Sequence, residues 1–127
     1  MAVAAVVLVC AVAGVAGACG ASSAHPRSAR AADDPAPPEV LVTLGDGGCS
    51  PTELSLPAGP VVFKVTNPGT TRVSEMEVQS ANGHVVNDVE GVGPGRTRSF
   101  VVNLRAGLTY RVRCPETALT GGIITVR

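Results

Sequence analysis

Residues 108–126 read LTYRVRCPETALTGGIITV and hold the pattern that decides the fold. From Leu108 to Cys114 apolar and polar side chains alternate, which is the period of a strand with one buried face. Pro115 has no N–H to give to a strand ladder, and Gly121-Gly122 permits a bend before a second apolar run. We therefore expect Cys114 on the core side at the end of a strand, beside a short loop.

Short apolar runs separated by turn residues continue back to residue 39. They predict eight strands, near residues 40–44, 53–56, 61–66, 72–78, 84–90, 97–104, 108–113 and 123–127. The segments between them, such as GDGG, NPGT, SANG and GVGPG, contain residues that favour turns. Regular spacing of this kind predicts an all-β sandwich.

Composition limits the size of the domain and the kinds of partner. The chain has 127 residues, 10 Lys+Arg and 10 Asp+Glu, so no charge excess favours a nucleic acid or another polyanion. Two Phe, one Tyr and no Trp predict a thin, aliphatic core. A core of this size usually needs a cross-link or a metal to be stable. We expect one small monomeric domain that does not bind nucleic acid.

The N-terminal residues predict export. Residues 1–18 are small or apolar from Ala2 onward, which is too short for a comfortable membrane span and typical of a signal peptide. The string AGAC, which ends at Cys19, resembles a lipoprotein signal with Cys19 as the lipidated residue. Ordinary secretion with cleavage after Ala18 is the alternative. Both predict a protein at the cell surface or in the periplasm.

Residues 19–38 predict a flexible tether. The segment is made of small, charged and proline residues with no apolar period. With a lipid on Cys19 it would hold the domain to a membrane, and His25 within it is expected to be solvated. The predicted organisation is thus a signal peptide at 1–18, a tether at 19–38 and a β domain at 39–127.

Two cysteines remain inside the domain. Cys10 leaves with the signal and Cys19 lies at the mature terminus, so Cys49 and Cys114 form the internal pair. If successive strands alternate in direction, Cys49, Glu75, the GVGPG loop and Cys114 gather at one end of the sandwich. His84 falls at the other end. A cysteine pair in an oxidising compartment favours a disulfide.

Several longer runs resemble a known family. LSLPAGPVVFKVTNPG, VGPGRTRSFVVNLRAGLTYRVRCP and GGIITV are similar to cupredoxins. More narrowly, DGGCSPTELSLPAGPVVFKVTN with SEMEV resembles the cupredoxin-like domain of EfeO-type iron-uptake proteins, especially the versions found in actinobacteria. The resemblance covers residues 39–127 and implies an eight-stranded Greek-key sandwich. In EfeO this domain is joined to a larger helical domain that we do not find here, so we expect a stand-alone module.

The ligands of a blue-copper centre are mostly missing. Ser74-Glu75 stands where that centre needs a histidine, Thr117 stands three residues after Cys114, and Leu119 and Thr120 occupy the methionine region. A trigonal site of two histidines and one cysteine cannot be built from these side chains. We therefore exclude ordinary blue-copper electron transfer.

The EfeO resemblance implies a different set of metal ligands. It carries over to Cys49, Glu75, Glu77 and Cys114, and it implies copper or iron as the metal and an envelope metal-transport protein as the partner. Thiolates with a carboxylate oxygen could hold either metal. If the two cysteines form a disulfide instead, no metal is expected.

The two glutamates also have alternative positions. Strand alternation directs Glu75 and Glu77 to water if Met76 and Val78 pack in the core, whereas a bulge could turn Glu75 inward. Asp46 is expected to be a turn acid. No G-x-S-x-G or H-E-x-x-H motif occurs, so we expect no enzyme. The sequence thus predicts an exported, lipid-anchored metal-handling module or, alternatively, a metal-free, disulfide-stabilised interaction domain of the cell envelope.

Overall fold

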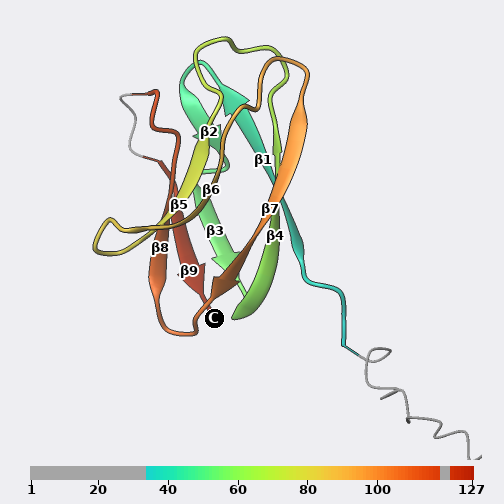
Figure 1. Cartoon of the computed structure of the whole chain (residues 1–127). Coiled ribbons are helices and arrows are strands. Elements are labelled where there is room, and N and C mark those ends of the chain that lie inside the picture. The colour runs from blue at the N-terminus through green and yellow to red at the C-terminus, as the bar shows by residue number, and fades with distance from the viewer. Residues whose placement is uncertain (1–33, 118–120) are drawn as a thin grey trace, which may run out of the picture. The chain divides into compact units, whose positions relative to one another are not determined.

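A computed structural model describes residues 34–117 and 121–127 (Figure 1). The chain divides into two units, Met1–Asp34 and Pro35–Arg127, and the second contains all the secondary structure described here. Residues 35–38 precede the first strand and are exposed. The predicted signal peptide, Cys19, His25 and most of the predicted tether lie outside the described residues.

The described part of Pro35–Arg127 consists of strands and connecting loops. Within it there are nine strands, namely β1 Glu39–Gly45, β2 Gly48–Ser50, β3 Glu53–Leu56, β4 Gly59–Thr66, β5 Met76–Ser80, β6 Val85–Val89, β7 Thr97–Leu104, β8 Thr109–Arg113 and β9 Ile123–Val126. In the part of the chain that the structure describes, no helix is long and apolar enough to cross a bilayer. The predicted all-β class is confirmed.

The strands form two sheets, which Figure 1 shows facing each other. One sheet has the order β2-β1-β4-β7 and the other has the order β3-β9-β8-β5-β6. Pairing is antiparallel except between β1 and β4 and between β3 and β9, which are parallel. The predicted cupredoxin-like sandwich is therefore correct in its layers.

The core lies between the two sheets and is built by strand alternation. In β1 the residues Val40, Val42 and Leu44 are buried while their neighbours along the strand face water. Phe63 of β4 and Ile124 of β9 are completely buried from opposite sheets. Most of the buried side chains are Val, Leu and Ile, so the core is aliphatic, as the composition predicts.

Two strand predictions differ from the structure. The three-residue strand β2 was not expected; it pairs with the end of β1 as a short hairpin, with Leu44 opposite Cys49. The fourth predicted strand, 72–78, is displaced to Met76–Ser80. Val73 is completely buried, which gives it the appearance of a strand residue, but it lies in the loop that precedes β5.

The strands run between two ends of the sandwich. One end, called the site pole below, is formed by residues 45–48, 67–75, 90–96 and 114–117; it is the upper end in Figure 1. At the opposite pole the chain enters β1, where the Val62 amide donates to the Pro38 carbonyl at 2.9 Å. The chain also ends there, where the Arg127 amide donates to the Leu56 carbonyl at 2.9 Å.

Candidate functional site

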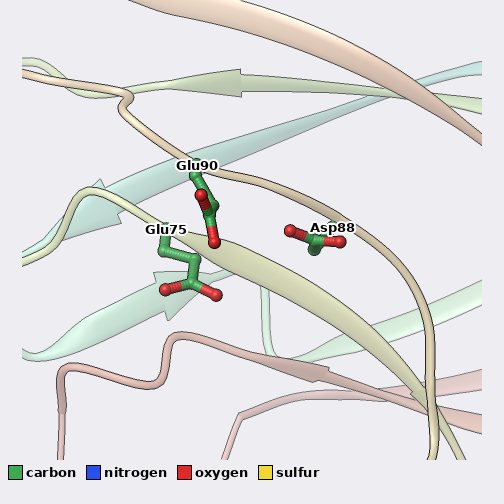
Figure 2. Close-up of side chains that lie close together, drawn as sticks. All are labelled: Glu75, Asp88 and Glu90. Atoms are coloured by element: carbon green, nitrogen blue, oxygen red, sulfur yellow. The ribbon is translucent and has the colours of Figure 1, made fainter.

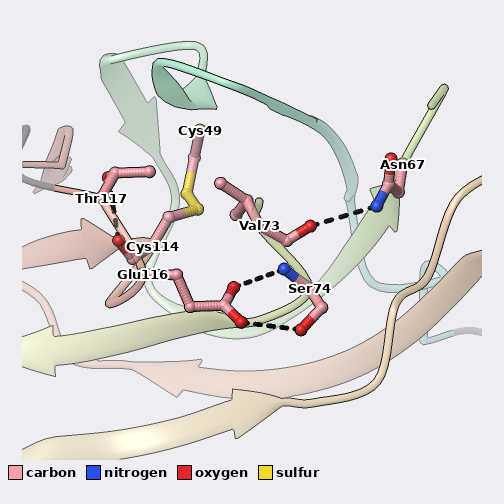
Figure 3. Close-up of a disulfide and its surroundings, with 7 residues drawn as sticks. All are labelled: Cys49, Asn67, Val73, Ser74, Cys114, Glu116 and Thr117. Carbon is pink, nitrogen blue, oxygen red and sulfur yellow. Dashed lines mark hydrogen bonds between the residues drawn. A yellow bond between two sulfur atoms is a disulfide. The ribbon is translucent and has the colours of Figure 1, made fainter. Parts of the chain in front are cut away.

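A disulfide joins the two sheets at the site pole. Cys49 lies on β2 and Cys114 directly follows β8; their Cα atoms are 6.0 Å apart (Figure 3). Both residues are buried, with 8% and 2% of their surface exposed. In this form neither sulfur is a thiolate, so the disulfide alternative of the sequence analysis agrees with the structure. The set of Cys49, Glu75, Glu77 and Cys114 as metal ligands stays a prediction that requires reduction.

Three carboxylates form a cluster at the same pole. One carboxylate oxygen each from Glu75, Asp88 and Glu90 lies within 4.8 Å of the others (Figure 2). Glu75 immediately precedes β5, Asp88 belongs to β6 and Glu90 immediately follows β6. The antiparallel pairing of β5 with β6 brings these positions together, because Glu77 stands opposite Asp88 and Met76 opposite Val89.

The comparisons with known proteins can now be set beside this geometry. Among protein-family models, the one described as Cupredoxin-like domain matches residues 6–126. The chain belongs to this family. The cupredoxin-like chain is also 35% identical over 102 residues to "Iron uptake system component EfeO" of Yersinia pseudotuberculosis, and the match covers 78% of this chain and 25% of that protein. The domain is thus of the EfeO type and spans about a quarter of the length of this relative.

Solved structures of cupredoxins share the fold. Auracyanin from Roseiflexus castenholzii superposes with a TM-score of 0.58 at 15% identity and covers 70% of this chain and 96% of that chain. Auracyanin A from Chloroflexus aurantiacus, described as a "blue" copper protein, gives 0.56 at 15% identity, covering 72% and 99%. At these identities the likeness concerns the fold alone.

The blue-copper positions hold a different arrangement in this cupredoxin-like domain. Ser74, where a histidine would be needed, donates from its hydroxyl to Glu116 Oε1 at 2.8 Å. Its amide donates to Glu116 Oε2 (Figure 3). Thr117 donates its hydroxyl to the Cys114 carbonyl at 3.0 Å. Leu119 and Thr120 lie outside the described residues. The Glu116 carboxylate therefore ties the segment after Cys114 to the loop before β5.

The two predicted glutamates share a face but have different surroundings. Met76 and Val78 are completely buried, so Glu75 and Glu77 lie on the outer side of the sheet, as the alternation predicts. Glu77 accepts a hydrogen bond from Gln79 Nε2 at 2.6 Å and stands opposite Arg113 of β8. Glu77 is not part of the carboxylate cluster.

The surroundings of the Glu75 carboxyl change its acidity. Burial raises the pKa of Glu75 above its ordinary value, and the negative charges of Glu77, Glu90, Glu116 and Asp88 raise it further. A cation held between these carboxylates would reverse the repulsive part of that shift. In the disulfide form, the groups of the site pole that could hold a cation are therefore these carboxylate oxygens.

The remaining candidates of the sequence analysis fall elsewhere. Met76 packs in the core, and His84 lies in the β5–β6 turn at the opposite pole, where its carbonyl accepts from the Ser80 amide at 2.9 Å. Asp46 lies in the β1–β2 turn, as expected, and its side chain accepts a hydrogen bond from the Thr70 hydroxyl of another loop. None of these residues belongs to the carboxylate cluster.

Sequence reasoning missed three acidic residues of the site pole. Asp88 and Glu90 lay inside an expected strand, where exposed acids are common, and Glu116 lay in an expected loop. The available signal was the pairing of two adjacent strands, which brings the start of β5 to the end of β6. Assuming that hairpin would have pointed to Glu90 as a neighbour of Glu75.

Proposed function

We propose that this cupredoxin-like domain is a metal-handling module that binds a hard transition-metal cation, with iron as the best candidate, through Glu75, Asp88 and Glu90. The observation that carries the proposal is the approach of these three carboxylates within 4.8 Å. Oxygen ligands favour hard cations, whereas copper prefers nitrogen and sulfur. The family and the EfeO relative, whose name describes an iron uptake component, support the same conclusion.

Copper binding would require the reduced protein. Reduction of the Cys49–Cys114 disulfide by two electrons and two protons from a dithiol would give two thiols on the core side of the site pole, whereas Glu75 and Glu77 lie on the outer side of the sheet. Thiolates are the softer ligands that copper prefers. The predicted set of Cys49, Glu75, Glu77 and Cys114 therefore belongs to the reduced form in this proposal.

Equilibrium dialysis of the full chain against ferric citrate and against a cupric salt, followed by elemental analysis, tests the proposal. We expect about one iron per disulfide-bonded chain, and a loss of affinity of at least about tenfold in Glu75→Gln and in Glu90→Gln. The matched control is Glu39→Gln at the opposite pole, which removes one exposed carboxylate and leaves the cluster intact. Absence of iron in the wild-type chain, or equal loss in Glu39→Gln, would refute the proposal.

The proposal includes export and an anchor. The apolar run at 2–18 followed by Cys19 supports a lipoprotein that presents the domain to a metal transporter of the cell envelope. Expression in a bacterial host with membrane fractionation tests this step. We expect the wild-type chain with the membranes and Cys19→Ser in the soluble exported fraction. Recovery of both proteins in the same fraction would contradict the anchor.

A second function is favoured by the disulfide itself. A buried cross-link between the sheets is what a metal-free interaction domain with a small core needs. The same dialysis separates the two functions. A fully disulfide-bonded chain that retains neither iron nor copper supports the interaction domain of the cell envelope, while carboxylate-dependent iron binding supports the metal-handling module.

A further inference from the structure

Asn67 is a fully buried polar residue directly after β4, at the site pole. None of its surface is exposed. Its side-chain nitrogen Nδ2 donates to three backbone carbonyls, those of Thr70 at 2.9 Å, Val73 at 3.1 Å and Val92 at 2.8 Å. Its Oδ1 accepts from the Gly69 amide at 2.9 Å. Since an amide group has two protons, one of them is shared between two carbonyls.

The backbone of Asn67 joins the same network. Its amide donates to the Arg96 carbonyl at 2.9 Å, and its carbonyl accepts from the Gly95 amide at 2.7 Å. One residue therefore fastens the end of β4 to the loop before β5 and to the loop after β6. Figure 3 shows the bond to the carbonyl of Val73, whose side chain lies beside the disulfide.

The carbonyls that Asn67 holds lie close in sequence to the candidate cation ligands. Val73 is two residues before Glu75, and Val92 is two residues after Glu90. A direct bond completes the connection, because the Val92 amide donates to the Ser74 carbonyl at 2.8 Å. The two loop segments next to the glutamates are thus joined both by this direct bond and through the Asn67 side chain.

We infer that Asn67 is a positioning residue for cation binding, and that it acts by fixing the distance between Glu75 and Glu90 through the carbonyls of Val73 and Val92. The inference rests on the proposed function. The hydrogen-bond partners of the Asn67 side chain are backbone groups of Gly69, Thr70, Val73 and Val92, not carboxylates of the cluster, so its effect on affinity is indirect. Partners that orient ligands in this way typically change metal affinity by about 10 to 100-fold when removed.

A buried amide also stabilises the fold. The test must therefore separate an effect on the position of the carboxylates from an effect on the stability of the domain. Asn67→Ala removes every side-chain hydrogen bond, and Asn67→Ser retains one hydroxyl donor. Val61→Ala is the matched control, because Val61 lies on β4, the strand that Asn67 directly follows, is completely buried and sits toward the opposite pole. It lowers stability through a cavity and leaves the loops of the site pole unchanged.

Ferric-ion affinity is measured on the disulfide-bonded full chain, at a temperature where each variant is folded by circular dichroism. We expect Asn67→Ser to weaken binding about tenfold and Asn67→Ala more, while Val61→Ala stays within about twofold of the wild type despite a lower Tm. Wild-type affinity in a folded Asn67→Ser variant would overturn the inference. An equal loss in Val61→Ala would also overturn it, since affinity would then follow stability.

Amide hydrogen exchange provides a readout that needs no metal. In Asn67→Ser we expect the Val92 amide to exchange at least about tenfold faster, while core amides of β4 change little. Unchanged protection of Val92 would refute the role of Asn67 in holding the loops. If the wild-type chain binds no ferric ion, the proposed function fails and the metal role of Asn67 fails with it. Hydrogen exchange still decides separately whether Asn67 fixes the loops.

Discussion

At the scale of single residues, three carboxylates of the site pole lie so close together that their repulsion lowers the stability of the fold. Glu75, Asp88 and Glu90 bring carboxylate oxygens within 4.8 Å of one another. Two basic side chains lie nearby: Arg98 donates to the Glu90 backbone carbonyl at 2.8 Å, and Arg113 stands opposite Glu77. Like charges on neighbouring strands are destabilising. An arrangement that lowers stability in the apo protein is a common property of sites that bind a ligand.

The pKa of Glu75 leads to a prediction on pH. Because its pKa is raised in the folded chain, first by burial and then by its acidic neighbours, ionisation of Glu75 lowers stability as the pH rises through the folded-state pKa. Glu75→Gln should therefore be more stable than the wild type by ~0.5 kcal/mol at pH 7. The gain should disappear below the ordinary value of 4.5, where both states are protonated. Urea denaturation across the pH range measures this difference, and a variant that is less stable at pH 7 would contradict it.

Residue types in the sequence predicted part of this site. Cys49, Cys114 and Glu75 were expected at one end because strands of alternating direction return their loops to the same end. The membership of Asp88 and Glu90 depends on which two strands pair and in which register. Local alternation in a strand carries no information on that register, so these two residues required the structure.

At the scale of elements, the backbone at the entry to β9 lies very close to neighbouring backbone. A Cβ atom on Gly122 would lie 2.6 Å from the Thr52 carbonyl oxygen and 2.7 Å from the Thr52 Cα. The neighbouring Ile123 amide donates to the same carbonyl at 2.8 Å, and the Gly122 carbonyl accepts from the Val112 amide at 2.8 Å. Gly121-Gly122 is thus needed for close approach as well as for the bend that the sequence predicts.

This crowding predicts the effect of one added methyl group. Gly122→Ala should lower the free energy of unfolding by ~1–3 kcal/mol, because it forces β3 and β9 apart. Gly93→Ala is the control, since a Cβ there meets nothing within 4 Å. Thermal denaturation of both variants measures the contrast. Equal stability of the two proteins would argue against close approach as the role of Gly122.

The hydrogen bonds between Ser74 and Glu116 predict a local effect on the loops. Ser74→Ala removes the bond from the hydroxyl to Oε1 and should cost ~0.5–1 kcal/mol. The loss should appear mainly as faster hydrogen exchange near residues 74 and 114–117, since the pair joins two loops rather than two strands. Ser99→Ala, on the exposed side of β7, is the control. If hydrogen exchange near these residues changed equally in both variants, the Ser74–Glu116 hydrogen bond would not be what holds the two loops together.

The two strand errors have the same physical origin. Gly48–Ser50 is too short and too rich in turn residues to predict a strand, and it becomes one because it pairs with the end of β1. Val73 is buried through the loop that Asn67 holds, without belonging to a strand. Both positions are decided by tertiary contacts, which override local propensity.

At the scale of the whole molecule, the disulfide supports a small core by joining the two sheets. It connects residues 65 positions apart. On the chain-entropy account, a closed loop of this length stabilises the fold by up to ~4 kcal/mol, and measured values are commonly lower. The sequence predicted the sandwich because its short apolar runs recur at regular spacing between turn residues, whereas the choice between a disulfide and two thiols needed the proximity of the two cysteines.

Reduction gives the corresponding prediction. In urea, a dithiol reductant should lower the stability of the wild-type chain by ~2–4 kcal/mol and raise the slope of the transition, because the unfolded chain becomes more expanded. A Cys49→Ala variant, whose Cys114 has no partner in the domain, should be insensitive to the reductant. A wild-type midpoint that does not move on complete reduction would contradict the prediction.

The entry of the chain beside Val62 and its exit beside Leu56 have a consequence for how the domain can be attached. Both connections leave from the end remote from Glu75 and the disulfide, as Figure 1 shows for β1 and β9. A linker, an affinity tag or a second folded unit that joins the domain before β1 or after β9 would therefore leave the carboxylates accessible. Immobilising the protein by its C-terminus should orient every copy with its acidic loops facing the solution.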